Sequence, residues 1–239
     1  MDSEPPGNIP PHRPFYWRHL WLPLAVCVPL LLLIEVTGVD HAINRWFFDD
    51  SAMRFPIRYN AVFEMVTHNW AKKFSLLVAG VACGALFASF VTSALREYRR
   101  VLLFLVLGLT LAPLTVTLLK ENSHRSCPWD LEEFGGTAPF VGLFDTPPPG
   151  HYPGRCFPSG HASNGFGLLA FYFGGRALGR KRLAMIGLWG GAAVGLLYGV
   201  ARLVQGAHFL SHVLWSGLVC WLVILLIYAV VIGPAREPR

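Results

Sequence analysis

Charged residues are scarce in this chain of 239 residues. Only 14% of the residues are Asp, Glu, Lys or Arg and 54% are hydrophobic, whereas roughly 25% of a soluble domain is charged. This shortage argues against an ordinary soluble protein. Six apolar runs approach the ~20 residues that a helix needs to cross a bilayer. We therefore predict an all-α bundle of six transmembrane helices near 20–39, 74–95, 101–119, 162–179, 183–201 and 213–235.

A small-residue cleavage site is missing from the first apolar run, which continues through LWLPLAVCVPLLLLIEV. We therefore expect a retained helix and not a removed signal peptide. The preceding segment is rich in proline and poor in apolar residues, which is typical of a disordered tail. The predicted organisation is a cytoplasmic tail at 1–19, a membrane domain at 20–235 and a second tail at 236–239.

Basic residues gather on one predicted side of the membrane. They lie near both termini and in the segments 96–100 and 176–182, and the whole chain has a formal net charge of +6. By the positive-inside rule this side is cytoplasmic, so both termini are predicted there. The opposite side, periplasmic if the membrane is a bacterial inner membrane as we expect, receives 40–73, 120–161 and 202–212. The basic balance is thus a signal of topology and does not indicate a nucleic-acid partner.

Cysteine is also rare, with five residues in the chain. Cys27, Cys83 and Cys220 fall inside apolar runs, where we expect them only to pack. Cys127 and Cys156 both fall in the predicted outer loop, where an oxidising compartment would allow a disulfide. Two free thiols are the alternative.

The outer loop between the third and fourth predicted spans, residues 121–160, is about 40 residues long. It contains TPPPG and several glycines, which disfavour regular structure. Loops of this length are seldom passive connectors and often carry function. We therefore expect functional residues in this loop or at its two ends.

Polar side chains gather where the chain meets this outer side. Lys120 and Arg125 follow the third predicted span, RCFPSGH enters the fourth, and ARLVQGAHFLSH joins the fifth to the sixth. Lysine and arginine neutralise phosphate oxygens, and a Ser-Gly turn at a helix start adds donors. One histidine can attack phosphorus while another transfers protons. The pattern indicates a phosphoanion site.

The same residues resemble the type 2 phosphatidic acid phosphatase superfamily. That family has the motifs Lys-x6-Arg-Pro, Pro-Ser-Gly-His and Ser-Arg-x5-His-x3-Asp. This chain has Lys120 before Cys127-Pro128, then PSGH at 158–161, then Arg202-x5-His208. Six spans also match the membrane-bound members, so the resemblance covers about residues 20–235.

The resemblance implies hydrolysis of a lipid phosphate or diphosphate without a metal or other cofactor. His208 falls at the position of the nucleophile and His161 at that of the general acid. The positions that bind phosphate in the family are occupied here by Lys120, Ser159, Gly160 and Arg202.

Three positions depart from the family pattern. Ala201 replaces a serine, and Cys127 replaces the arginine of the first motif, so Arg125 is the expected substitute. His212 replaces the aspartate that would hold the nucleophilic imidazole. A neutral His212 could accept the same hydrogen bond, or a carboxylate from elsewhere could supply the charge. The carboxylates considered are Asp130, Glu132, Glu133, Asp145 and Glu64.

Alternatives remain open at this point. His161, His208 and His212 could form a metal site, since histidines four residues apart share a helix face, although the nearby Lys and Arg oppose a dication. The phosphoryl group could pass to another lipid instead of water. The altered motifs would also suit an inactive relative that binds anionic lipids. A transporter would place its charges near the bilayer midplane, and these lie at one face.

Overall fold

The computed structural model describes residues 13–150 and 152–233, and these residues form helices joined by loops. Strand pairing in the described ranges is limited to two isolated bridges, Asp49 with Arg54 and Leu131 with Ala138. The predicted all-α class is confirmed.

Five helices of the described chain are long and apolar enough to cross a membrane. The first joins α1 (Arg13–Tyr16), a π-helical turn and α2 (Leu22–Thr37), and the second joins α4 (Ala61–Glu64), a π-helical turn and α5 (Ala71–Val91). The other three are α7 (Arg99–Glu121), α10 (Lys181–Val204) and α11 (Leu210–Val231). The protein is therefore an integral membrane protein.

The fourth predicted span, 162–179, is helical but interrupted. It consists of α8 (Gly160–Phe166), a 3-10 turn (Gly167–Leu169) and α9 (Ala170–Ala177), and it is not among the five apolar helices. The predicted count of six spans is therefore not confirmed. This segment packs against α7, α10 and α11, and most of its side chains are buried by protein.

Glycines on α10 allow this central segment to pack closely. Gly187, Gly191 and Gly195 recur every four residues, and a Cβ at any of them would collide with the 166–172 stretch. Small residues at this spacing let two helix backbones approach in a membrane. The approach brings the start of α8 beside the end of α10.

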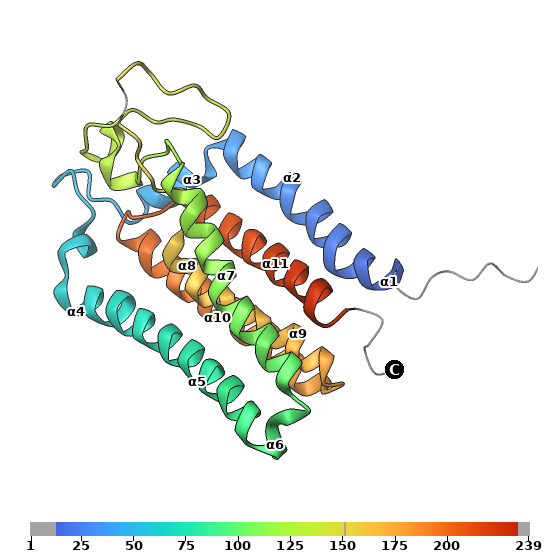
Figure 1. The fold of residues 1–239 in the computed structure, drawn as a ribbon. Coiled ribbons are helices and arrows are strands. Elements are labelled where there is room, and N and C mark those ends of the chain that lie inside the picture. The colour runs from blue at the N-terminus through green and yellow to red at the C-terminus, as the bar shows by residue number, and fades with distance from the viewer. Residues whose placement is uncertain (1–12, 151, 234–239) are drawn as a thin grey trace, which may run out of the picture.

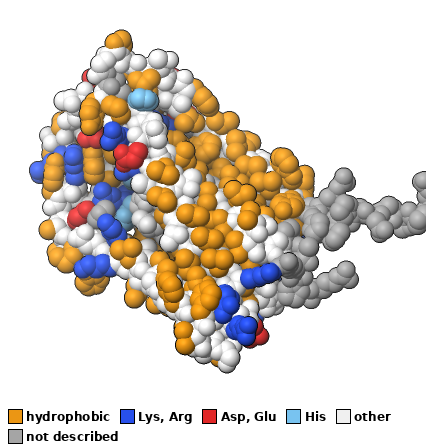
Figure 2. Space-filling model, in the orientation of Figure 1, with side chains coloured by type: hydrophobic (Ala, Val, Ile, Leu, Met, Phe, Trp, Pro, Cys, Tyr) orange, Lys and Arg blue, Asp and Glu red, His pale blue; other side chains and the backbone are white. Residues whose placement is uncertain are grey.

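The helices run side by side, with α2 on one edge of the bundle and α5 on the other (Figure 1). The long loop lies at one end of the bundle, and the described chain begins and ends at the opposite end. Hydrophobic side chains cover the middle of the visible face, while Lys and Arg gather towards the two ends (Figure 2). This distribution suits a protein whose middle lies in hydrocarbon.

Residues 13–19, which the sequence assigns to the predicted tail, are helical in the structure and lie in α1 and the π-helical turn Trp17–Trp21. His19 holds this part of the chain against the bundle. Its ring is buried and contacts the Phe15 carbonyl and the Tyr172 hydroxyl at 2.8 and 2.7 Å, so it ties this helix to α9. The predicted tail residues 1–12 and 236–239 lie outside the described residues.

In the described part of the loop between α7 and α8, which leaves out residue 151, helical structure is limited to two 3-10 turns, Pro128–Asp130 and Glu132–Phe134. The loop is tethered at several points. Trp129 N donates to Gly206 O at 2.9 Å, and Cys156 N donates to Arg125 O at 2.9 Å. A small apolar cluster also joins the loop to the chain that follows α3 (Val39–Arg45) and to the residue before α11. Its members are Phe48, Phe55, Leu131, Phe134 and Phe209.

Candidate active site

Four helix ends meet below the long loop between α7 and α8. Lys120 is in the last turn of α7, Ser159 is the N-cap of α8, Arg202 is in the last turn of α10, and His208 lies just before α11. Each predicted motif thus reaches the same end of the bundle because each lies at a helix terminus.

The connection from α10 to α11 is held in a defined conformation. Gly206 has φ +72°, and a Cβ there would also collide with the Phe55 ring. Ala207 N donates to Arg202 O at 2.9 Å, which closes the helix end. Asn44 Nδ2 donates to the His208 carbonyl at 3.4 Å. These contacts hold the His208 backbone in place.

His208 is buried, with 6% exposure. Burial lowers its pKa well below the usual value, and the positive charges of Arg202, Lys120 and His161 lower it further. The imidazole is therefore neutral near pH 7 and keeps a lone pair. The same effect indicates that Arg202, Lys120 and His161 lie close enough to His208 to influence its charge.

His161 lies on the first turn of α8 and is half-buried. Its Nε2 donates to the Thr67 carbonyl at 2.6 Å, and its ring packs 5.3 Å from the Tyr198 ring. The carbonyl therefore fixes which ring nitrogen carries the proton. Neither Thr67 nor Tyr198 stands in a motif, so sequence reasoning missed both.

Ser159 and Gly160 shape the start of α8. The fully buried Ser159 accepts from Ala162 N through its hydroxyl, and its own N donates to His212 O at 3.0 Å. A Cβ at Gly160 would lie 3.9 Å from Lys120 Cδ, so the lysine side chain passes beside this glycine. The first two motifs are therefore adjacent.

Arg202 is held by two residues outside the motifs. Its Nη1 donates to Glu64 Oε2 and Gln205 Oε1, both at 2.8 Å, and Gln205 Nε2 donates to Glu64 at 2.9 Å. Glu64 was expected only as a remote carboxylate for His208, whereas the structure pairs it with Arg202. Gln205 was not expected at all.

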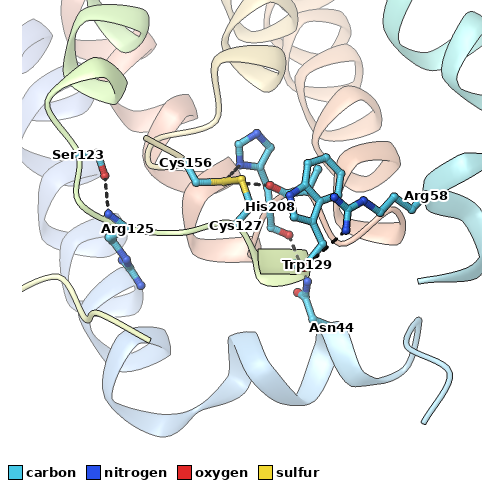
Figure 3. Close-up of a disulfide and its surroundings, with 9 residues drawn as sticks. Asn44, Arg58, Ser123, Arg125, Cys127, Trp129, Cys156 and His208 are labelled. Carbon is cyan, nitrogen blue, oxygen red and sulfur yellow. Dashed lines mark hydrogen bonds between the residues drawn. A yellow bond between two sulfur atoms is a disulfide. The ribbon is translucent and has the colours of Figure 1, made fainter. Parts of the chain in front are cut away.

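Arg125 is oriented differently from Lys120 and Arg202. Its Nη1 donates to Glu35 Oε2 at 2.9 Å, and both side chains are buried, with 6% and 7% exposure. In Figure 3 its guanidinium extends away from His208. The expected substitute for the missing motif arginine therefore forms an ion pair with α2. Glu35 was the available signal, because a carboxylate inside an apolar run requires a partner.

Cys127 and Cys156 form a disulfide, with a Cα–Cα distance of 5.2 Å. It joins the first motif to the chain just before the second. The Cys156 sulfur is also 3.4 Å from His208 Nδ1 (Figure 3). A disulfide sulfur has no hydrogen, so Nδ1 can only donate to it. The disulfide thus contacts the ring of the predicted nucleophile directly.

His212 is fully buried, and among the described residues neither of its ring nitrogens has a hydrogen-bond partner. Its ring centroid is 5.8 Å from that of His208. Two of the loop carboxylates considered for His208 have other partners, since Glu133 pairs with His41 and Asp145 accepts from Gly142 N. The Nδ1 atom of His208 contacts the Cys156 sulfur and not a carboxylate.

The residues that the structure brings close enough to bind a metal are not the three histidines considered from the sequence. One ligand atom each from Cys156, His208 and His212 lies within 4.8 Å of the other two, and all three residues are buried. His161 is instead engaged with Thr67. While Cys156 remains in the disulfide it cannot supply a thiolate.

Comparison with known proteins agrees with this arrangement. The model of the PAP2 superfamily matches residues 101–233. The chain is 25% identical over 220 residues to a protein named lipid A 4'-phosphatase from Francisella tularensis subsp. novicida (strain U112), covering 88% of this chain and 95% of the relative. No solved structure matches. Because the family match covers more than half of the chain and all three motifs described above, the chain belongs to the PAP2 superfamily.

Proposed function

We propose that this protein hydrolyses the phosphate monoester or diphosphate of a membrane lipid at the end of the bundle below the outer loop. One observation carries the proposal: Lys120, His161 and Arg202 lie at helix ends that meet beside the buried His208, and their positive charges help to lower its pKa. Such a group of cations favours a phosphoanion, and a neutral imidazole is the form that can attack it.

The first step is attack by His208 on phosphorus. Because Nδ1 is 3.4 Å from the Cys156 sulfur, we assign the attack to Nε2. The N–P bond forms as the bond from phosphorus to the leaving oxygen breaks, and His161 protonates that oxygen. Lys120 and Arg202 neutralise the non-bridging oxygens, which carry most of the negative charge in the transition state.

The second step is hydrolysis of the phosphohistidine. His161, now deprotonated, removes a proton from water as the water attacks phosphorus, and the N–P bond breaks to return His208 and release inorganic phosphate. The charge stabilisation comes from Lys120 and Arg202, so the scheme requires no metal.

The topology is part of the proposal. The interrupted helix from Gly160 to Ala177 forms a sixth span, shielded from lipid by α7, α10 and α11. Both termini are then cytoplasmic by the positive-inside rule, and the site faces outward, periplasmic in a bacterial inner membrane. A lipid can remain in the bilayer while its headgroup reaches the site at this depth.

The substrate class is a lipid phosphate. The name of the relative, lipid A 4'-phosphatase, favours a phosphorylated glycolipid as the first substrate to test. Transfer of the phosphoryl group to a second lipid differs only in the acceptor. The histidine in place of aspartate at 212 is the observation that favours the remaining alternative, an inactive relative that binds anionic lipids.

The proposal predicts release of inorganic phosphate from purified protein in detergent given lipid A, phosphatidate, phosphatidylglycerol phosphate or undecaprenyl diphosphate. Activity on at least one of them should be unchanged by a chelator. Loss of activity on chelation would contradict the metal-free scheme. Loss of the substrate phosphate without release of inorganic phosphate would identify the phosphotransferase, and binding without turnover would identify the inactive relative.

A second prediction concerns Arg125. Because it forms a buried ion pair with Glu35, Arg125→Ala and Glu35→Ala should each lower the free energy of unfolding by about 3–5 kcal/mol. The KM of the folded fraction for lipid phosphate should stay within about threefold of wild type. Thermal unfolding in detergent and steady-state kinetics measure the two effects.

The double variant Glu35→Gln/Arg125→Met is the control. It should be more stable than either alanine variant, because it leaves no unpaired buried charge. A KM raised more than tenfold in Arg125→Ala, with Glu35→Ala unaffected, would instead make Arg125 a phosphate ligand.

A further inference from the structure

The proposed mechanism uses His208 but gives no chemical step to Cys156 or His212, which lie beside it. Cys156 and His212 are fully buried and His208 is 6% exposed, and their ligand atoms lie within 4.8 Å of one another. Two of these atoms, Cys156 Sγ and His208 Nδ1, are 3.4 Å apart. Figure 3 shows the His208 ring turned towards the sulfur.

The 3.4 Å separation of Cys156 Sγ and His208 Nδ1 is that of neighbouring ligands around zinc. A tetrahedral zinc ion binds sulfur at ~2.3 Å and nitrogen at ~2.0–2.1 Å, which separates neighbouring ligand atoms by roughly 3.3–3.7 Å. Thiolate and imidazole are also the ligands that zinc and cobalt(II) prefer. One pair already has this separation, and a small movement of His212 would complete the set.

The environment of the His212 side chain independently indicates a ligand. It is fully buried, and neither ring nitrogen has a hydrogen-bond partner in the described parts of the chain. An imidazole without a partner in a protein interior is costly. A metal ion bound by one of its nitrogens would satisfy that nitrogen.

The disulfide blocks this site, because the Cys156 sulfur is bonded to Cys127 and cannot become a thiolate. A dithiol reductant converts the disulfide to two thiols and is itself oxidised to a cyclic disulfide. A divalent metal then displaces the proton of the Cys156 thiol and binds the sulfur. The negative charge of the thiolate offsets the repulsion from Arg202, which Glu64 already neutralises in part.

We propose that reduction of the Cys127–Cys156 disulfide opens an inhibitory zinc site made of Cys156, His208 and His212. Only the inhibition rests on the proposed function. A neutral imidazole has one lone pair on nitrogen, so when Nδ1 of His208 binds metal its proton resides on Nε2. Nε2 then has no lone pair with which to attack phosphorus. The enzyme is therefore inactive until the metal is removed or the disulfide forms again.

Two serine variants separate this proposal from simple loss of the disulfide. Cys127→Ser and Cys156→Ser both break the bond, but only Cys127→Ser leaves a thiol at position 156. Cys127→Ser should bind about one zinc per chain without reductant and should show a thiolate-to-cobalt charge-transfer band with cobalt(II). Cys156→Ser retains Cys27, Cys83 and Cys220 and frees Cys127, so it controls for other thiols.

The expected affinity of Cys156→Ser for zinc, measured by competition with a chromophoric indicator, is at least ~10-fold weaker than that of Cys127→Ser. His212→Ala in the Cys127→Ser background should weaken binding by a similar factor. Equal zinc binding by the two serine variants, or no effect of His212→Ala, would overturn the site.

Wild-type protein covers the case in which neither serine variant folds. After reduction by a dithiol and desalting it should gain the cobalt band, and the oxidised protein should lack it; a reduced protein without the band overturns the site. Zinc should also inhibit phosphate release by Cys127→Ser, and a chelator should restore it. Metal binding without inhibition would confirm the metal site and contradict its inhibitory role. If the protein has no phosphatase activity, the cobalt band still tests whether the site exists.

Discussion

Alanine in place of His208 should stop phosphate release, with kcat lowered by at least ~10³-fold, the scale seen when a covalent nucleophile is removed. The expectation follows from the geometry around this residue. His208 is the buried histidine on which the charges of Arg202, Lys120 and His161 act. Release of inorganic phosphate from the best substrate of the lipid panel measures the effect.

His161→Ala should behave differently from His208→Ala. Loss of a general acid and base lowers the rate by roughly 10²–10⁴-fold. With a lipid diphosphate the leaving phosphate needs little protonation, so hydrolysis of the intermediate becomes the slow step. A phosphoenzyme that is stable to alkali and labile to acid should then accumulate in His161→Ala and be absent from His208→Ala.

His124→Ala, which replaces an exposed histidine of the loop, is the matched control. The activity of this variant should equal that of the wild type. Size-exclusion profiles and helical circular dichroism should be the same for all three variants. If His208→Ala kept full activity, the phosphohistidine mechanism would be wrong whatever the other variants do.

Lysine in place of Arg202 should lower kcat/KM by roughly 10²–10³-fold even though it keeps the charge. One guanidinium nitrogen of Arg202 already donates to Glu64 and Gln205. The planar fork offers further N–H donors to a phosphate. A single ammonium cannot satisfy Glu64 and the buried Gln205 while also binding two phosphate oxygens.

Arg58→Lys is the control for Arg202→Lys. Both arginines lie over the Trp129 ring, at 4.3 and 5.7 Å from its centroid, but Arg58 is not one of the residues of the proposed site. Its kcat/KM should change less than threefold. Similar losses in both variants would mean that packing on Trp129, and not phosphate binding, explains the effect.

The sequence by itself was sufficient for the class of the fold and for the family. Low charge and long apolar runs predict membrane helices because hydrocarbon excludes unpaired polar groups. The spacings of PSGH and Arg202-x5-His208 carry the resemblance to the family, and each is a local pattern placed at a helix end. The family assignment and the all-α class were both confirmed.

Other predictions depended on partners far along the chain. Arg125 was expected at the phosphate, but it pairs with Glu35, 90 residues away. Glu64 was a remote candidate for His208, but it pairs with Arg202 across 138 residues. The charges were visible in the sequence, yet nothing local indicates which of several carboxylates a given arginine will meet.

The structure of the interrupted segment from Gly160 to Ala177 also depends on partners far along the chain. Its sequence predicted a membrane span at 162–179, and the structure contains a 3-10 turn at Gly167–Leu169 within a largely buried segment. The glycines of α10 that pack against this segment are visible in the sequence, but their role depends on which helix packs against them. Its burial is decided by that packing, because neighbouring helices can replace lipid as its surroundings.

Composition and motif spacing thus determined that this is a membrane protein of the PAP2 superfamily whose motifs lie at helix ends. Only the tertiary structure decided that the Cys156 sulfur, rather than a carboxylate, faces His208 Nδ1, and that His212 is buried among aromatic rings without a described partner. The physical reason is that a motif specifies residues a few positions apart. The atom that contacts a side chain depends on how distant segments pack.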